Sequence, residues 1–162
     1  MIKVFYSILV SIFLISVAYT KPITCSFEEV YENGEQQQGY FFFQNNKIRY
    51  EYLNKNLYTI LFINNNFYLI ENLDRKKIQL VPENNTAFPI LSEIFLSFPN
   101  LKQTYKNKDY EVNIEESSNI FLKRVVIKSI DMNVSIYFIN CNNDNLNEGL
   151  FNFNPFLEYV HN

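Results

Sequence analysis

The stretch from Gln38 to Leu53 reads QGYFFFQNNKIRYEYL and places two aromatic runs on either side of a short polar segment. Each run has the length and the aromatic content of a β-strand. The asparagines between the runs tolerate the positive φ angles that a tight turn requires. The stretch therefore predicts a β-hairpin with strands at Gly39–Gln44 and Lys47–Leu53.

The same pattern continues along the chain, where short apolar runs alternate with asparagine-rich turns at roughly ten-residue spacing. This spacing is typical of an antiparallel meander, so the sequence predicts a mainly β fold. The further expected strands are Cys25–Tyr31, Leu57–Ile63, Phe67–Glu71, Lys77–Val81, Tyr110–Glu116, Ile120–Ile130, Val134–Asn140 and Leu150–Asn154.

One segment in the middle of the chain has a helical period instead. Its apolar residues recur at three- and four-residue steps, which places them on one face of a short amphipathic helix. The residues on that face are Phe88, Leu91, Phe95 and Phe98. Thr86 is the expected N-cap, and Pro99 ends the helix.

Two of the predicted strands are apolar on both faces, namely GYFFF at residues 39–43 and LYTILFI at residues 57–63. Antiparallel strands of this kind need cover on both faces. A single helix covers one face. The other cover comes from curvature of the sheet, from a partner, or from a hydrophobic ligand.

Length and composition bound the class of protein. The chain has 162 residues, of which 48% are hydrophobic and 17% aromatic. This length suits one domain, and the composition provides enough apolar side chains for a sizeable core. The formal net charge of −3 argues against nucleic-acid binding, which usually needs a basic face.

Residues 1–20 have the layout of a secretory signal peptide. Lys3 precedes an apolar run from Val4 to Val17, and small residues follow around Ala18 and Thr20. The run is short for a membrane span, and an uncleaved anchor is the alternative. We therefore expect a signal-peptide helix at residues 1–20 and a single exported domain at residues 21–162.

The two cysteines, Cys25 and Cys141, fit an oxidising compartment. A disulfide between residues so distant in sequence could stabilise the fold by roughly 4–5 kcal/mol. Two separately buried thiols are the alternative, because sequence spacing does not reveal whether the two strands are neighbours.

Catalytic and metal-binding chemistry finds little support in the sequence. The chain has one histidine, His161, and two distant cysteines, which cannot supply a zinc site in the usual spacings. The adjacent pairs Glu28/Glu29 and Glu115/Glu116 point to opposite faces of a strand and are interpreted as solvated charges. We therefore expect a binding protein rather than an enzyme, with no metal and no cofactor.

The order of these parts resembles the periplasmic outer-membrane lipoprotein carrier family, which is called LolA-like. That family has a glycine opening an aromatic strand, an Arg-aromatic strand, two hairpins, a helix near a Thr-Pro pair and a closing element with alternating phenylalanines before a proline. The matching stretches here are Gly39 with YFFF, KIRYEY at 47–52, TILFINNNFYLIENL at 59–73, TAFPILSEIF at 86–95, and the C-terminal segment with Phe151, Phe153 and Pro155.

This resemblance implies an open, strongly curved antiparallel half-barrel whose apolar concave face is covered by one or two short helices. It implies a monomeric carrier in the periplasm of a Gram-negative bacterium. Such a carrier shelters lipoprotein acyl chains between an inner-membrane ABC exporter and an outer-membrane acceptor. The Phe88–Phe95 helix would be the lid, with Phe88, Leu91, Phe95 and Phe98 on its apolar face. The implied cavity-lining residues are Phe41, Phe43, Tyr50, Leu61, Ile63, Phe138, Phe151 and Phe153.

The chain also departs from the family pattern. Few residues separate the predicted signal peptide from the first strand, so the family's N-terminal helix is missing or replaced. QNNK stands in place of the Lys-Arg-Pro turn whose arginine holds the lid closed in the family. Arg49 matches a different position and is expected at the sheet surface or rim, paired with a nearby glutamate.

Four alternatives remain open from the sequence, of which an enzyme that uses an unrecognised carboxylate pair is the last. The aromatic side chains also suit a compact core without a ligand, since phenylalanine and tyrosine are common in β-sheets. A binding protein or sensor for another envelope lipid is the second. A structural envelope protein, held through the exposed edges of its sheet, is the third.

Overall fold

The computed structural model describes residues 21–82 and 87–154, and these form one antiparallel sheet with a single α-helix. The helix α1 spans Phe88–Ser97, and a short 3-10 helix, η1, spans Glu148–Phe151. The ten strands are β1 (Ile23–Tyr31), β2 (Gln36–Gln44), β3 (Lys47–Tyr52), β4 (Tyr58–Ile63), β5 (Asn66–Glu71), β6 (Ile78–Val81), β7 (Thr104–Lys106), β8 (Glu111–Ser117), β9 (Leu122–Lys128) and β10 (Asn133–Asn142).

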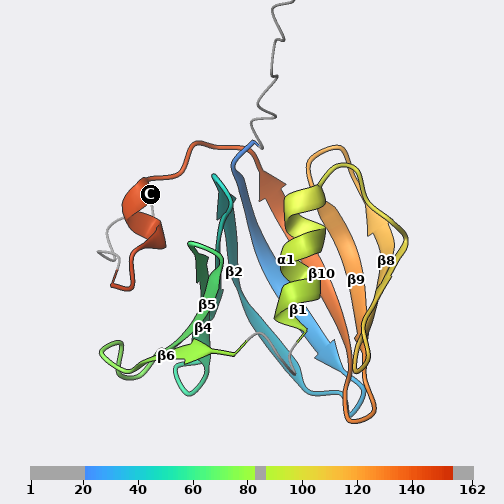
Figure 1. Cartoon of the computed structure of the whole chain (residues 1–162), viewed down its shortest axis with the longest axis horizontal. Helices are drawn as coiled ribbons and strands as arrows, with labels where there is room; N and C mark the ends of the chain where they lie inside the picture. Colours follow the sequence, from blue (N-terminus) through green and yellow to red (C-terminus); the bar gives the residue numbers. More distant parts are fainter. Residues whose placement is uncertain (1–20, 83–86, 155–162) are drawn as a thin grey trace, which may run out of the picture.

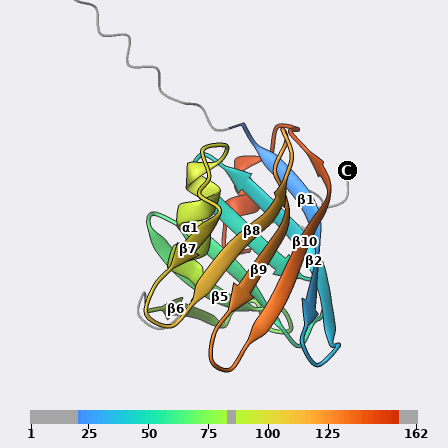
Figure 2. The same ribbon diagram turned by 90° about the vertical axis from the view of Figure 1, so that its right-hand side faces the viewer.

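Strand β1 lies near the middle of the sheet and pairs with β2 on one side and β10 on the other. The sheet order is β6-β5-β4-β3-β2-β1-β10-β9-β8-β7, so two meanders meet at β1 and α1 connects them along the chain. The sheet is open, with β6 and β7 at its edges, and it curves around α1 (Figures 1 and 2). The expectation of a mainly β, open antiparallel fold with a covering helix is confirmed.

The asparagine-rich turns adopt the conformation that their composition predicts. Asn45 and Asn46 have φ angles of 50° and 59°, and Asn64 and Asn65 have φ angles of 51° and 61°. Two consecutive positive φ angles are characteristic of a two-residue hairpin turn, whose twist matches that of the flanking strands. These two turns set the register of β2 with β3 and of β4 with β5.

Some predicted elements differ in the structure. Residues 150–154 do not form a strand, because Leu150 and Phe151 are consecutive buried residues of η1. The three-residue strand β7 was not predicted, since it is too short to show an alternating pattern. Ala87 takes the N-cap position of α1 without a side-chain hydrogen bond. Thr86, the expected cap, lies outside the described residues, as do residues 1–20 with the predicted signal-peptide helix.

The main core lies between the concave face of the sheet and α1. Alternate residues of β1 are buried there, including Cys25 and Phe27, and Phe138 of β10 lies opposite Phe27. Cys25 and Cys141 form a disulfide that joins β1 to β10. Because the bridge spans 116 residues, it stabilises the fold by about 4–5 kcal/mol through the entropy of the unfolded chain.

The outer face of β2–β5 is covered by the C-terminal part of the chain (Figure 1). The apolar residues buried there, which we call the outer cluster, are Phe42, Leu61, Ile70, Leu150 and Phe151. Gln44 holds this segment by donating to the carbonyl of Leu146 at 3.3 Å and accepting from its backbone N–H at 2.9 Å. The strands that are apolar on both faces are therefore covered on the second face by a segment of the chain itself. We did not expect this cover from the sequence.

Candidate functional site

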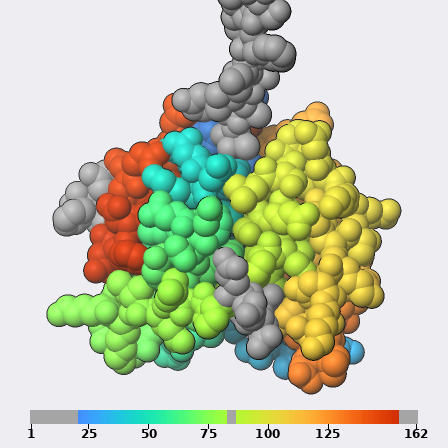
Figure 3. Space-filling model, viewed as in Figure 1, coloured from blue at the N-terminus to red at the C-terminus, as the bar shows by residue number. Residues whose placement is uncertain are grey.

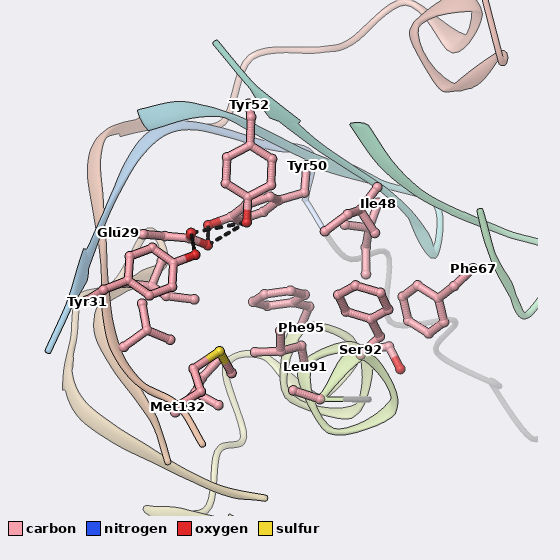
Figure 4. A pocket seen from close by; sticks show the side chains of 16 residues that line it. Glu29, Tyr31, Ile48, Tyr50, Tyr52, Phe67, Leu91, Ser92, Phe95 and Met132 are labelled. Carbon is pink, nitrogen blue, oxygen red and sulfur yellow. Dashed lines mark hydrogen bonds between the residues drawn. The ribbon is translucent and has the colours of Figure 1, made fainter. Parts of the chain in front are cut away.

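A cavity of about 140 Å³ lies between the concave face and α1 (Figure 4). Its walls are mostly apolar side chains from β3, β4, β5, β9, β10 and the helix. An engineered cavity of about 150 Å³ lined by apolar side chains stays dry and accepts a benzene-sized molecule. The cavity is therefore large enough for the end of an acyl chain, but it is too small for a whole lipid.

One half of α1 faces the cavity, while the other half is anchored in the core. Phe88, Leu91 and Ser92 line the cavity from the first half of the helix. Phe95 also reaches the cavity, but it packs in the core as well. Its ring centroid lies 4.9 Å from that of Phe41 and 5.8 Å from that of Phe121. The space-filling view shows the helix between the two halves of the sheet (Figure 3).

Apolar contacts join α1 to the sheet. Among the described residues, no hydrogen bond or ion pair links a side chain of α1 to a strand. Ser92 donates to the carbonyl of Pro89 within the helix, and exposed Glu93 pairs with Lys102 beyond its end at 3.5 Å. In the described part of the chain, the side chains of α1 therefore contact the sheet through apolar atoms alone.

The cavity has one polar end, formed by a carboxylate and three tyrosines (Figure 4). Glu29 is only 4% exposed. Tyr31 donates to its Oε2 at 2.7 Å, Tyr50 donates to its Oε1 at 2.8 Å, and Tyr52 reaches both oxygens at 2.9 and 3.1 Å. We refer to these four residues as the Glu29–tyrosine cluster.

The three hydroxyl groups of this cluster are held in their protonated form. Burial raises the pKa of Tyr31, Tyr50 and Tyr52 well above the usual value, and the negative charge of Glu29 raises it further. The tyrosines therefore act as hydrogen-bond donors to the carboxylate throughout the physiological pH range.

A groove of about 320 Å³ adjoins the cavity at this polar end. The cavity and the groove share Tyr31, Tyr52, Ile60 and Phe88 in their walls. The groove is more polar than the cavity, and Glu35 and Gln37 contribute to it. The Glu29–tyrosine cluster thus lies where the apolar cavity meets the more polar groove.

The structure divides the residues expected to line a cavity between two faces of the sheet. Tyr50 lines the cavity, and Phe41, Phe43 and Phe138 lie beside it in the main core. Leu61, Ile63, Phe151 and Phe153 lie instead on the outer face, in or against the outer cluster. Of the four residues expected on the lid helix, three line the cavity, and Phe98 packs against Phe121 just beyond the helix end.

The sequence predicted Tyr50 in the cavity wall, but Glu29, Tyr31 and Tyr52 were missed. Glu28 and Glu29 do point to opposite faces, as expected, and Glu28 accepts a hydrogen bond from Gln38 at the exposed surface. The interpretation of Glu29 as a solvated charge is wrong. The sequence of β1 does indicate that Glu29 faces the core. Alternate residues of a strand share a face, and Glu29 and Tyr31 follow Cys25 and Phe27 at two-residue steps.

The expected place of Arg49 at the sheet surface or rim is also wrong. Its side chain is fully buried beneath the C-terminal segment, and it pairs with Glu51 at 2.8 Å. Its guanidinium also donates to the carbonyls of Leu150 and Asn152 at 3.4 and 3.3 Å. Burial lowers the pKa of Arg49, while Glu51 opposes this shift. Arg49 therefore holds the C-terminal segment in place and does not contact the cavity.

Metal ligands, membrane-spanning helices and similar proteins were also sought. The described ranges contain no cluster of three or more His, Cys, Asp or Glu side chains that could hold a metal ion. In the same ranges, no helix has the length and hydropathy needed to cross a membrane. No protein-family model matches the chain, and a search of curated sequences found no match.

Proposed function

We propose that this protein is an exported carrier that shelters acyl chains of envelope lipoproteins between its curved sheet and α1. The observation that carries the proposal is the apolar cavity beneath a helix whose contacts with the strands are apolar among the described residues. The resemblance of the sequence to the LolA-like family also supports the proposal. In this setting the donor is an inner-membrane exporter and the recipient is an outer-membrane acceptor.

Loading requires the first half of α1 to swing outward. The closed cavity accepts only a chain end, whereas each methylene group that leaves water contributes about 0.8 kcal/mol. A chain that displaces Phe88 and Leu91 gains access to the concave face beneath them. Return of the helix competes for the same surface, so it assists release to an acceptor.

Substitution Leu91→Asp tests the role of the helix in binding. Leu91 is half-buried and faces the cavity, so a charged side chain there adds a desolvation cost to any apolar ligand. We expect at least about a tenfold loss of affinity for N-dansylhexadecylamine, an uncharged fluorescent C16 chain, in a titration of the purified protein.

Leu73→Asp is the matched control, because Leu73 is 74% exposed and lies outside the cavity walls. This variant should bind the probe as the wild type does. Mass spectrometry of protein exported to a Gram-negative periplasm should additionally detect co-purified lipoprotein or acyl lipid. A ligand-free protein that also fails to bind the probe would contradict the proposal.

A further inference from the structure

Glu29 carries a buried carboxylate. Among the described residues, no lysine or arginine forms an ion pair with it. Buried charges in proteins are normally paired with an opposite charge, because transfer of an isolated ion from water is costly. In this cluster, three hydroxyl donors replace the missing cation.

The surroundings of the cluster favour a positive charge. Neither the walls of the cavity nor those of the groove contain lysine or arginine. Their charged residues are Glu29 in the cavity and Glu35 in the groove. A cation that enters by the groove therefore meets negative charges and no repelling group among the described wall residues.

The cluster also retains unused hydrogen-bonding capacity. An ionised carboxylate accepts roughly four hydrogen bonds, and the three tyrosines make four contacts with Glu29, because the single hydroxyl of Tyr52 reaches both oxygens. Each tyrosine hydroxyl that donates can still accept a bond through its oxygen. An ammonium group, with three N–H donors, matches this set of acceptors, and the neighbouring aromatic rings can add cation–π attraction.

We propose that Glu29, Tyr31, Tyr50 and Tyr52 recognise a primary ammonium group that lies directly beside the alkyl or acyl chains of the ligand. The inference rests on the proposed function and narrows its substrate class. A lipoprotein offers this chemistry when its diacylglyceryl-modified N-terminal cysteine keeps a free α-amino group. The chains would enter the apolar cavity, the ammonium would lie at the cluster, and the rest of the lipoprotein would leave through the groove.

Two ligand pairs test the proposal by displacement of bound N-dansylhexadecylamine. The first is an S-dipalmitoylglyceryl-cysteinyl peptide with neutral following residues, with a free or an acetylated α-amine. The second is hexadecylamine and hexadecanol. Since a bond to a charged group is roughly twice as strong as a neutral one, we expect the amine of each pair to bind about tenfold more tightly.

Substitution Glu29→Gln keeps the shape of the side chain and removes its charge. In this variant the two members of each pair should bind within about twofold of each other. Tyr31→Phe is a second variant for the case in which Glu29→Gln does not fold. It frees one acceptor site on Oε2 and should keep or increase the preference for the amine.

The possible outcomes are distinguishable. Equal affinity within both pairs in the wild-type protein, or an unchanged preference in Glu29→Gln, would overturn the ammonium inference and leave the carrier function standing. Binding of hexadecylamine in preference to hexadecanol, with neither lipopeptide bound, would support ammonium recognition and contradict the lipoprotein cargo. Failure of all four ligands to bind would overturn both proposals.

Discussion

Gly39 of β2 has no room for a side chain. A Cβ atom there would lie 2.1 Å from the carbonyl oxygen of Glu51 and 2.4 Å from the ring of Phe27. That ring stacks on Tyr50, with 3.8 Å between the ring centroids, and so supports one wall of the cavity. The glycine that opens the aromatic strand is therefore a packing requirement of the site.

Substitution Gly39→Ala should destabilise the protein by about 1–3 kcal/mol or more, because the added methyl group overlaps backbone and a buried ring. The free energy of unfolding from urea titration measures this effect. Gly149→Ala is the control, since a Cβ there would meet the Asn147 side-chain oxygen at 3.2 Å and the Asn152 side-chain nitrogen at 4.0 Å. Equal unfolding midpoints for the two variants would argue against the packing role of Gly39.

Glu29 and Arg49 show why charged residues are hard to place from one sequence. Strand alternation assigns each to a face, but it does not say whether that face is covered. The cover over Arg49 comes from residues about a hundred positions later, and the donors to Glu29 include tyrosines of another strand. Their burial depends on tertiary contacts that local patterns do not contain.

At the scale of elements, the two apolar covers of the sheet have different roles. Helix α1 lies over a cavity and has no polar attachment to the strands among the described residues. The segment with η1 packs against the outer cluster and is fixed by Arg49, by Gln44 and by an ion pair between Lys47 and Glu148. Apolar contacts join the first element to the sheet, whereas hydrogen bonds and an ion pair also hold the second.

Substitution Leu150→Ala tests the structural role of η1. Leu150 is almost fully buried in the outer cluster, so we expect the free energy of unfolding to fall by about 2–5 kcal/mol. Affinity for N-dansylhexadecylamine should stay at the wild-type value below the unfolding transition, because Leu150 does not line the cavity. A selective loss of affinity with unchanged stability would show that the outer face binds the ligand.

The helical period of residues 88–98 predicted α1 and three of its cavity-lining residues, since regular spacing reports the buried face of a helix. The alternation of Phe151 and Phe153 was less informative. Two phenylalanines at this spacing fit a strand, but here they belong to a short 3-10 helix and the turn after it. Short segments contain too few residues to distinguish the two periods.

At the scale of the whole molecule, the Glu29–tyrosine cluster links stability to alkaline pH. An unfolded tyrosine loses its proton near pH 10, whereas the native pKa of Tyr31, Tyr50 and Tyr52 is higher. Above pH 10 the native state therefore binds more protons than the unfolded state. The free energy of unfolding must then decrease as pH rises.

We expect urea unfolding measured between about pH 9 and pH 11 to show this decrease in the wild-type protein. The slope should be shallower for Tyr52→Phe, which removes one of the shifted groups. Leu73→Ala, at an exposed side chain that has no proton to lose, should keep the wild-type slope. Parallel pH profiles for all three proteins would contradict a contribution from the cluster.

The strand order of the whole sheet was only partly accessible from sequence. Asparagine-rich turns predicted the hairpins, because each joins strands that are consecutive along the chain. The pairing of β1 with β10 has no local signature. For the same reason, the disulfide between Cys25 and Cys141 stayed an open alternative until the two strands were seen as neighbours.

That central pairing has a consequence for the order of events during synthesis. The chain emerges N-terminus first, in synthesis as in the export that we propose, so β1 appears early and β10 almost last. One edge of β1 therefore stays unpaired while the β1–β6 meander can already form. Until β10 arrives, the nascent chain presents an unpaired strand edge and a lone thiol at Cys25. Pairing of β1 with β10 is therefore a late, long-range step in folding. Before it occurs, the open edge of β1 can pair with a strand of another chain.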